Sequence, residues 1–289
     1  MVKAIRHYVD IAKPGILSAN LVSTAGGFFL ASRGRVDTAL LLATVTGVSL
    51  VVASACVFNN YLDRDLDKIM ERTCNRVLPR GAVPARAACL YAAFLAIIGA
   101  VLLETEVNTL SLVVVSAGFI IYVGVYSLLL KRTCVYATLI GSLAGAAPPL
   151  AGYCAAANRF DLGAAILTAI FVLWQVPHYY AIGIFRCDDY AAAKIPVLPV
   201  QQGATAAKRH IVCYILLYTA AAPMLTLCGY TGYRYLAAAT ASGLIWLFIA
   251  LSGNKTSNER LWAWKLYIFS ILAMLVLSLM MSLDAIRAG

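Results

Sequence analysis

A dense polar segment follows directly on a long apolar run. Two of its carboxylates, Asp63 and Asp67, stand four residues apart, with Asn59 at the same spacing before them. Four residues is a little over one helical turn, so these side chains lie on nearly the same helix face. Carboxylate and amide oxygens suit Mg²⁺, and neighbouring basic side chains suit phosphate groups. The spacing predicts a site for Mg²⁺ and a phosphate-bearing ligand. The alternative is a solvated loop whose charges only set the topology.

The side chains expected to hold that ligand come from two segments. Asn60, Arg72 and Arg76 belong to the same polar stretch, while Lys131 and Arg132 stand in a later short loop. Lys131 and Arg132 could reach a diphosphate, although topology alone would also place them there.

A second acidic cluster, Asp188 and Asp189, follows another apolar run, with Arg186 and Lys194 around it. Adjacent residues diverge by about 100° on a helix, so these two carboxylates cannot chelate as a pair one turn apart does. They could still meet, across a cleft, a metal held by Asp63 and Asp67. Two polar loops in matching positions of two halves favour one site built between them.

The segment before this cluster reads Trp174-Gln175-Val176-Pro177-His178-Tyr179-Tyr180. Pro177 is expected to kink or open the helix and free backbone carbonyls beside His178. His178 could be a base or an iron ligand, or a histidine hydrogen-bonded to such a carbonyl. The aromatic residues, Tyr180 among them, could line a flat or polyisoprenoid ligand, or belong to an interfacial belt.

The composition shows which elements must position these residues. The mean hydropathy is +0.83, and 62% of residues are hydrophobic while only 12% are charged. These values exclude a soluble globular protein. Nine apolar runs reach or approach membrane-spanning length, roughly residues 15–31, 38–58, 87–103, 110–130, 135–155, 162–182, 211–228, 235–251 and 266–283. We expect an all-α polytopic bundle of nine transmembrane helices forming one domain, residues 1–289, with the first run retained rather than cleaved as a signal peptide.

Basic residues predict the orientation in the bilayer. Of the 23 Lys and Arg residues, most fall on the side that holds the N-terminus and both long polar loops, residues 59–86 and 183–210. The opposite side has Arg33, Arg35, Arg159, Arg234 and Arg287. This bias predicts that the N-terminus and both acidic loops are cytoplasmic and the C-terminus lies on the other side. The basic residues stand in short loops without a soluble binding domain, so a nucleic-acid partner is excluded. The eight Cys residues show neither a zinc spacing nor a disulfide pattern.

Several strings resemble the intramembrane prenyltransferase superfamily and, within it, the haem-farnesylating branch, the haem O synthase family. The strings are Lys13-Pro14-Gly15, Asn59 to Asp67, Met70-Glu71-Arg72-Thr73, Lys131-Arg132-Thr133, Pro148-Pro149-Leu150, Trp174 to His178 and Ile195 to Pro199. The resemblance runs from Lys13 to about Leu283. Two departures stand out: the first motif has Asn59-Asn60 where the superfamily often has Asn-Asp, and the second keeps only Asp188 and Asp189.

This resemblance implies farnesyl diphosphate and haem B as substrates, haem O and diphosphate as products, and Mg²⁺ as cofactor. It implies a bacterial cytoplasmic (inner) membrane location, and it leaves open whether a haem A synthase or a terminal-oxidase assembly also binds the chain. The implied metal ligands are Asp63, Asp67, Asp188 and Asp189, which with His178 form the expected catalytic set. The implied substrate-binding residues are Asn59, Asn60, Arg72, Arg76, Lys131, Arg132, Gln175, Tyr180, Arg186 and Lys194. The alternatives are a related prenyltransferase acting on a hydroxybenzoate, a naphthoate or a chlorophyllide and, more distantly, an ion-coupled transporter.

Overall fold

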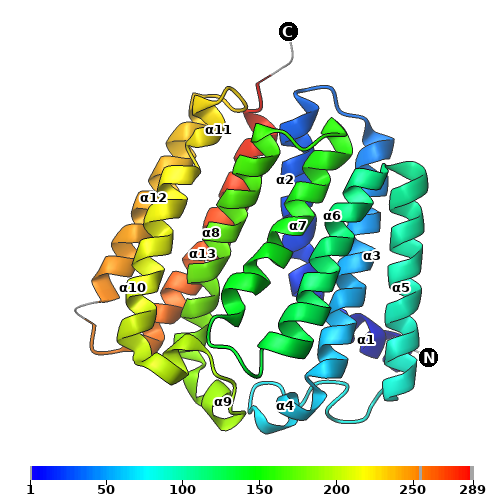
Figure 1. Ribbon diagram of the computed structural model, residues 1–289, viewed down its shortest axis with the longest axis vertical. Helices are drawn as coiled ribbons and strands as arrows, with labels where there is room; N and C mark the ends of the chain where they lie inside the picture. Colours follow the sequence, from blue (N-terminus) through cyan, green and yellow to red (C-terminus); the bar gives the residue numbers. More distant parts are fainter. Residues whose placement is uncertain (1, 254–255, 287–289) are drawn as a thin grey trace.

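The computed structural model describes residues 2–253 and 256–286, an all-α bundle in which those residues form no β-strand (Figure 1). Within this described part, nine helical segments are long and apolar enough to cross a membrane. They are α2 (Pro14–Ser32), α3 (Thr38–Leu62), α5 (Ala85–Glu106), α6 (Thr109–Phe119) continued by the π-helix η1 (Ile120–Leu130), α7 (Ala137–Ala157), α8 (Leu162–Phe185), α10 (Leu198–Ala221) continued by α11 (Met224–Leu227), α12 (Tyr233–Ser252) and α13 (Glu259–Leu283). The short helices are α1 (Val2–Ile11), α4 (Arg64–Ile69) and α9 (Cys187–Ala192). The nine-helix prediction is confirmed.

The largest departure from the sequence concerns the seventh span. Its helix begins at Leu198, well before the apolar run predicted at residue 211, and bends at Gly203, whose φ is 81°. The extra turns carry polar side chains such as Gln201 and Gln202, which are exposed. Hydropathy detects only the apolar part of a helix, so the sequence predicts a loop for these polar turns.

Side-chain caps fix where several spans begin. The carboxylate of Asp37 accepts from the N–H of Leu40 at 3.0 Å, at the start of α3. Asn108 (2.8 Å), Asp161 (3.2 Å) and Asn258 (2.9 Å) do the same for α6, α8 and α13. Such caps satisfy N–H groups that a first helical turn leaves without partners.

Pro148 and Pro149 lie inside a membrane span without ending its helix. The helix α7 runs through both, and α8 runs through Pro177. The backbones of α2 and α7 come very close here, because a Cβ on Gly27 would overlap the Pro149 carbonyl oxygen. Small residues permit this close packing of membrane helices.

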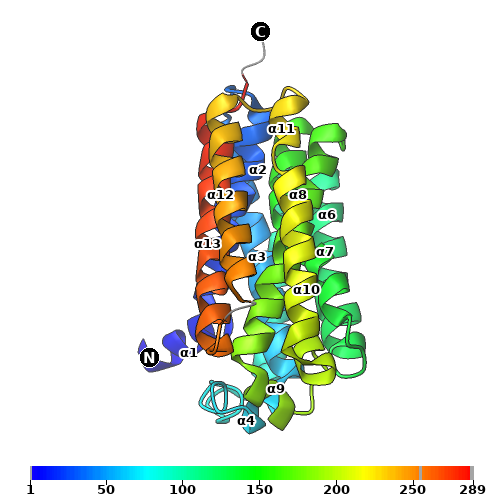
Figure 2. The ribbon, with the colours of Figure 1, turned by 90° about the vertical axis from the view of Figure 1, so that its left-hand side faces the viewer.

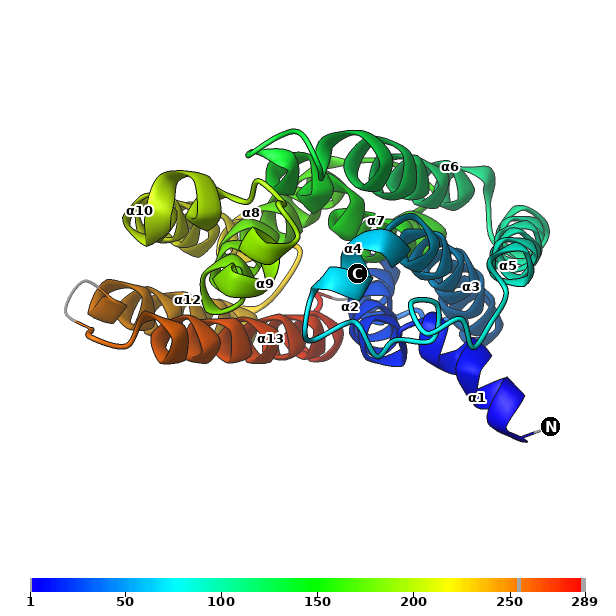
Figure 3. The ribbon, with the colours of Figure 1, turned by 90° about the horizontal axis from the view of Figure 1, so that it is seen from below.

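The polar helices gather at one end of the bundle. In Figure 2, α1, α4 and α9 all lie at the lower end, and Figure 3 shows α4 and α9 from that side. The two polar loops pack on each other through buried apolar side chains, namely Leu66 and Met70 from the first and Ala193 and Ile195 from the second. The bundle therefore brings both acidic segments to the same face, as the distribution of basic residues predicts.

Candidate active site

The first acidic motif straddles the end of a membrane helix. Asn59 and Asn60 lie in the last turn of α3, so the polar loop begins later than the sequence indicates. Asp63 leaves helical geometry, with φ −89° and ψ 0°, and α4 begins directly after it. The Asp67 N–H still donates to the Asp63 carbonyl at 2.7 Å, which preserves the one-turn relation between the two residues. Both side chains are buried, with exposures of 3% for Asp63 and 1% for Asp67.

The two carboxylate oxygens of Asp63 differ in their hydrogen bonds. Its Oδ2 accepts from Lys131 Nζ at 2.5 Å and from Asn59 Nδ2 at 2.8 Å. Asn59 Nδ2 also donates to Ser127 Oγ at 3.0 Å, which ties the π-helix η1 to α3. The other carboxylate oxygen, Oδ1, is buried and accepts no hydrogen bond from any described residue. A buried acceptor left in this way is costly unless something binds it.

A lysine from the start of the chain joins this network. Lys13 Nζ donates to Asn59 Oδ1 at 2.6 Å. Burial lowers the pKa of Lys13 to about 8. One residue along the motif, Asn60 Nδ2 donates to the Ile11 carbonyl at 2.7 Å. The sequence pointed to Lys13 only through the family-like string around it, since a contact across 46 residues leaves no spacing signal.

Asp67 is paired within its own loop. Arg76 Nη1 lies 3.1 Å from Oδ1 and 3.0 Å from Oδ2 of Asp67. The fully buried Thr73 donates its hydroxyl to the Asp67 carbonyl at 3.1 Å and closes the turn between them. The structure therefore brings Arg76 to one of the two predicted metal ligands.

Asp65 and Arg132 form a separate, exposed pair. Arg132 Nη1 and Nη2 lie 2.7 and 2.8 Å from the two Asp65 oxygens, and Nη2 also donates to the Leu62 carbonyl at 2.8 Å. The hydrogen bond from Arg132 lowers the pKa of Asp65 to about 2. Arg132 thus pairs with Asp65 on α4, whereas its neighbour Lys131 pairs with Asp63.

The second loop meets the first through a longer contact. Asp189 Oδ2 lies 3.9 Å from Arg72 Nε, while Asp188 is exposed on α9. Among the described residues, no three His, Cys, Asp or Glu side chains are close enough together to hold a metal ion. Joint metal binding by the four carboxylates therefore stays a prediction.

Two further predicted binding residues lie at the edge of this loop. Lys194 is exposed, with φ 53°. The Arg186 guanidinium lies over the Phe185 ring at 5.1 Å.

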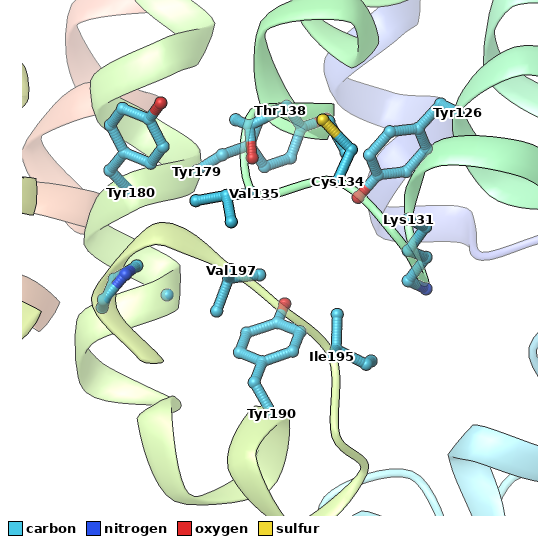
Figure 4. A pocket seen from close by; sticks show the side chains of 13 residues that line it. Tyr126, Lys131, Cys134, Val135, Thr138, Tyr179, Tyr180, Tyr190, Ile195 and Val197 are labelled. Atoms are coloured by element: carbon cyan, nitrogen blue, oxygen red, sulfur yellow. The ribbon is translucent and has the colours of Figure 1, made fainter. Parts of the chain in front are cut away.

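An aromatic cavity adjoins the charged cluster (Figure 4). Tyr126, Tyr179, Tyr180 and Tyr190 line it together with Lys131. These side chains come from η1, α8 and α9 and from the segment after η1. Tyr180 is 1% exposed, and no described residue bonds its hydroxyl. Because Lys131 both lines the cavity and contacts Asp63, the aromatic and charged parts are continuous.

His178 is hydrogen-bonded from another helix, not by a carbonyl that Pro177 frees. Its Nδ1 lies 2.6 Å from Ser270 Oγ on α13, and its ring stacks on Trp174 at 4.9 Å. Ser270 donates its only hydroxyl proton to the Tyr267 carbonyl at 2.5 Å. With the Ser270 proton on the Tyr267 carbonyl, Nδ1 is the donor to Ser270 and the lone pair of a neutral imidazole lies on Nε2.

Gln175 lies between two helices. It is 5% exposed, and its amide occupies the space that a Cβ on Gly145 would fill. No described residue bonds its Oε1. Gly145 therefore permits close packing of α7 on α8 and makes room for a polar side chain.

Comparison with known proteins agrees with this architecture. The profile of the UbiA prenyltransferase family matches residues 20–281. The chain is 56% identical, over 97% of its length and 95% of theirs, to proteins named protoheme IX farnesyltransferase from Photorhabdus laumondii and Yersinia pseudotuberculosis.

Solved structures show the same fold at low identity. A structure described as digeranylgeranylglyceryl phosphate synthase has TM-score 0.80 and 18% identity, covering 98% of this chain and 99% of its own. A UbiA homologue from Archaeoglobus fulgidus bound to GPP and Mg²⁺ has TM-score 0.72 and 14% identity, covering 96% of this chain and 99% of its own. The chain therefore belongs to the UbiA prenyltransferase family and is a transferase.

Proposed function

We propose that this protein transfers the farnesyl group of farnesyl diphosphate to a vinyl group of haem B, giving haem O and diphosphate. The observation that carries this proposal is the 56% identity, across almost the whole chain, to proteins named protoheme IX farnesyltransferase. The proposal assigns the whole chain, residues 1–289, to one prenyltransferase domain.

The charged cluster fits the diphosphate end of the donor. Arg76 lies against Asp67 and Lys131 against Asp63, so basic side chains are already held where phosphate oxygens would need them. When diphosphate enters, Lys131 and Arg76 exchange a carboxylate partner for a phosphate partner. Charge-assisted bonds to phosphate are strong enough to support this exchange.

The same residues fit Mg²⁺. Hard oxygen donors are what this ion prefers, and the buried Asp63 Oδ1 accepts no bond from any described residue. Asp63 and Asp67 would hold the ion from one loop, and Asp188 and Asp189 from the other. Bound Mg²⁺ would neutralise charge on the diphosphate and make it a better leaving group.

The reaction begins when the allylic C–O bond breaks and its electron pair leaves with the diphosphate. The π electrons of the haem vinyl group then form a bond to C1 of the farnesyl cation. Water adds to the resulting cation and loses a proton, which leaves a hydroxyethylfarnesyl substituent. Tyr126, Tyr179 and Tyr190 line the cavity beside Lys131, where their ring faces favour a cation and their bulk keeps water away from the first one.

The acceptor is assigned to the aromatic group around His178. Trp174 and Tyr267 pack on the His178 ring at 4.9 and 5.0 Å, and Tyr179 joins this group to the cavity. Flat aromatic side chains suit a porphyrin face. The lone pair on Nε2 could bind the haem iron or orient the water that ends the reaction.

The location and orientation are also proposals. The basic bias supports a cytoplasmic N-terminus in a bacterial inner membrane, with the acidic loops on the cytoplasmic side. The C-terminus is then periplasmic, although Gly289 itself lies outside the described residues. A topology reporter fused after Gly289 should give the signal expected of a periplasmic C-terminus. The signal of a cytoplasmic C-terminus would contradict this orientation. A haem A synthase or an oxidase assembly would act downstream, on the haem O product.

Purified protein in nanodiscs tests the reaction. Incubation with haem B, farnesyl diphosphate and Mg²⁺ should yield haem O by mass spectrometry, and EDTA should abolish it. Parallel samples contain 4-hydroxybenzoate, a naphthoate or chlorophyllide instead of haem B. Prenylation of one of these acceptors, with haem B left unchanged, would contradict the proposal.

A further inference from the structure

The junction between α1 and α2 adopts an unusual backbone. Lys13 has φ 57° and ψ 69°, the left-handed conformation, just after α1 ends at Ile11. Glycine is the usual residue at such a position, because a Cβ makes the conformation unfavourable. A lysine here retains backbone strain that glycine would relieve, and strain of this kind tends to be kept at functional sites.

This junction holds both amides of the Asn59-Asn60 pair. Lys13 Nζ donates to Asn59 Oδ1 at 2.6 Å, and the Ile11 carbonyl accepts from Asn60 Nδ2 at 2.7 Å. Ile11 and the next residue, Ala12, are 2% and 5% exposed, so the junction is packed against the bundle. Asn59 and Asn60 are also buried, so both partners of these contacts are held in place by packing.

The contact with Lys13 decides which way the Asn59 amide faces. An ammonium group can only donate, so it requires the amide oxygen and turns the amide NH₂ group away from itself. Asn59 Nδ2 consequently donates to Asp63 Oδ2 at 2.8 Å and to Ser127 Oγ at 3.0 Å. With the amide reversed, the NH₂ group would face the ammonium and the oxygen would face the carboxylate, and both contacts would be repulsive.

The orientation of the Asn59 amide in turn determines which oxygen of the Asp63 carboxylate accepts a hydrogen bond from it. Oδ2 receives the bonds from Asn59 and Lys131, while Oδ1 is buried without a donor from the described part of the chain. One oxygen is fixed and the other is left available as a ligand. Partners behind a metal ligand commonly control its geometry and affinity in this way.

We propose that Lys13 is a positioning residue, which orients the Asn59 amide and thereby presents Asp63 Oδ1 to Mg²⁺. It acts through Asn59 and does not touch the substrate. The inference rests on the proposed metal-dependent prenyl transfer, but it is independent of which acceptor receives the prenyl group.

The first test measures metal binding directly. Mn²⁺ binding is followed by electron paramagnetic resonance with the full-length protein in neutral-lipid nanodiscs, with inorganic diphosphate present. Lys13→Met should weaken Mn²⁺ binding about tenfold, the lower end of the effect of such outer partners. Lys13→Arg, which keeps a donor, should recover most of the affinity. Arg6→Met removes an exposed charge from α1 and should bind Mn²⁺ like the wild type.

A double-mutant cycle with Asn59→Ala isolates the route of the effect. If Lys13 acts through Asn59, adding Lys13→Met to Asn59→Ala should change Mn²⁺ affinity less than twofold, because residues in one network are not additive. An equal loss in both backgrounds would overturn the proposal. So would an unchanged Mn²⁺ affinity accompanied by a higher KM for farnesyl diphosphate, which would indicate a direct phosphate contact.

A further variant separates positioning from folding. Lys13→Gly removes the amine but suits the left-handed backbone. It should melt no lower than the wild type while showing the same Mn²⁺ defect as Lys13→Met. Normal Mn²⁺ binding by Lys13→Gly would exclude the positioning role. The Mn²⁺ measurement needs no acceptor, so failure to form haem O in a separate assay would contradict the proposed function and leave this inference standing.

Discussion

Lys131 and Asp63 meet at 2.5 Å although they are 68 residues apart in the chain. The contact joins the residue after the π-helix η1 to the residue that ends α3. A π-helix is wider than an α-helix and often occurs at functional sites. Here Ser127, near the end of η1, is directed at Asn59, and Lys131, the residue after η1, is directed at Asp63.

Removing either buried carboxylate should abolish most activity. Asp63→Ala and Asp67→Ala should each lower kcat about 100-fold or more, because each removes a candidate ligand and a partner of the basic side chains. Haem O formation is measured alongside the amount of protein in the membrane. Asp37→Asn, which removes a carboxylate while keeping the cap on α3, should retain normal activity. Full activity in Asp67→Ala would refute the metal assignment.

Arg76 should matter for stability as well as for binding. Arg76→Met leaves the carboxylate of Asp67, which is 1% exposed, without its paired cation. Breaking a buried pair by removing one partner typically costs about 3–5 kcal/mol. Because Arg76 is one-third exposed, we expect the lower end of that range, about 3 kcal/mol. Thermal unfolding in detergent measures the change, and Arg80→Met, an exposed arginine of the same loop, should leave the melting temperature within error.

Asp65 should be far less important than its neighbours. It pairs with Arg132 on the surface, and that contact lowers the pKa of Asp65 to about 2. The folded pKa is below the unfolded value of 3.8, so any stabilisation is present above pH 3.8 and is lost as pH falls toward 2. Between pH 5 and 8, Asp65→Asn should therefore show a kcat–pH profile parallel to that of the wild type. A loss of activity as large as that of Asp67→Ala would contradict the distinction between the two helix faces.

His178 should be required for haem contact. If Nε2 binds the iron, His178→Ala should weaken haem binding and shift the Soret band of the complex. Ser270→Ala keeps the imidazole but removes the partner of Nδ1, so its effect on the Soret band should be smaller. A folded His178→Ala protein with unchanged haem affinity and spectrum would exclude this role. Slower turnover with an unchanged spectrum would instead indicate a residue that orients water.

The membrane spans could be predicted because the bilayer requires long apolar helices. The start of α10 could not be predicted in this way, because its first turns are polar and hydropathy does not distinguish polar helical turns from a loop. Neither Pro148-Pro149 nor Pro177 ends its helix, so a proline in the sequence does not by itself mark the end of a membrane span here.

For the site, the sequence predicted the relation between Asp63 and Asp67, which depends on local spacing alone. The partners of these residues depend on tertiary packing. Arg132 and Lys131 are adjacent and looked equivalent, yet one pairs with an exposed carboxylate and the other with a buried one. The contact of Lys13 could not be predicted from the family-like string around it, because only the folded bundle brings Lys13 to Asn59.

The charged cluster also has a consequence for biosynthesis. Lys13, one of its donors, leaves the ribosome before the other residues of the cluster, whereas Asp189 reaches Arg72 only after α8 and α9 have been made. During that interval Asp63 and Asp67 have already been made, but the second loop is absent. Because chains are built N-terminal part first, a nascent chain can pair these carboxylates with Lys131 and Arg76 long before the second acidic loop arrives. The internal ion pairs would then protect the half-made protein, keeping buried charges neutralised until the catalytic face is complete.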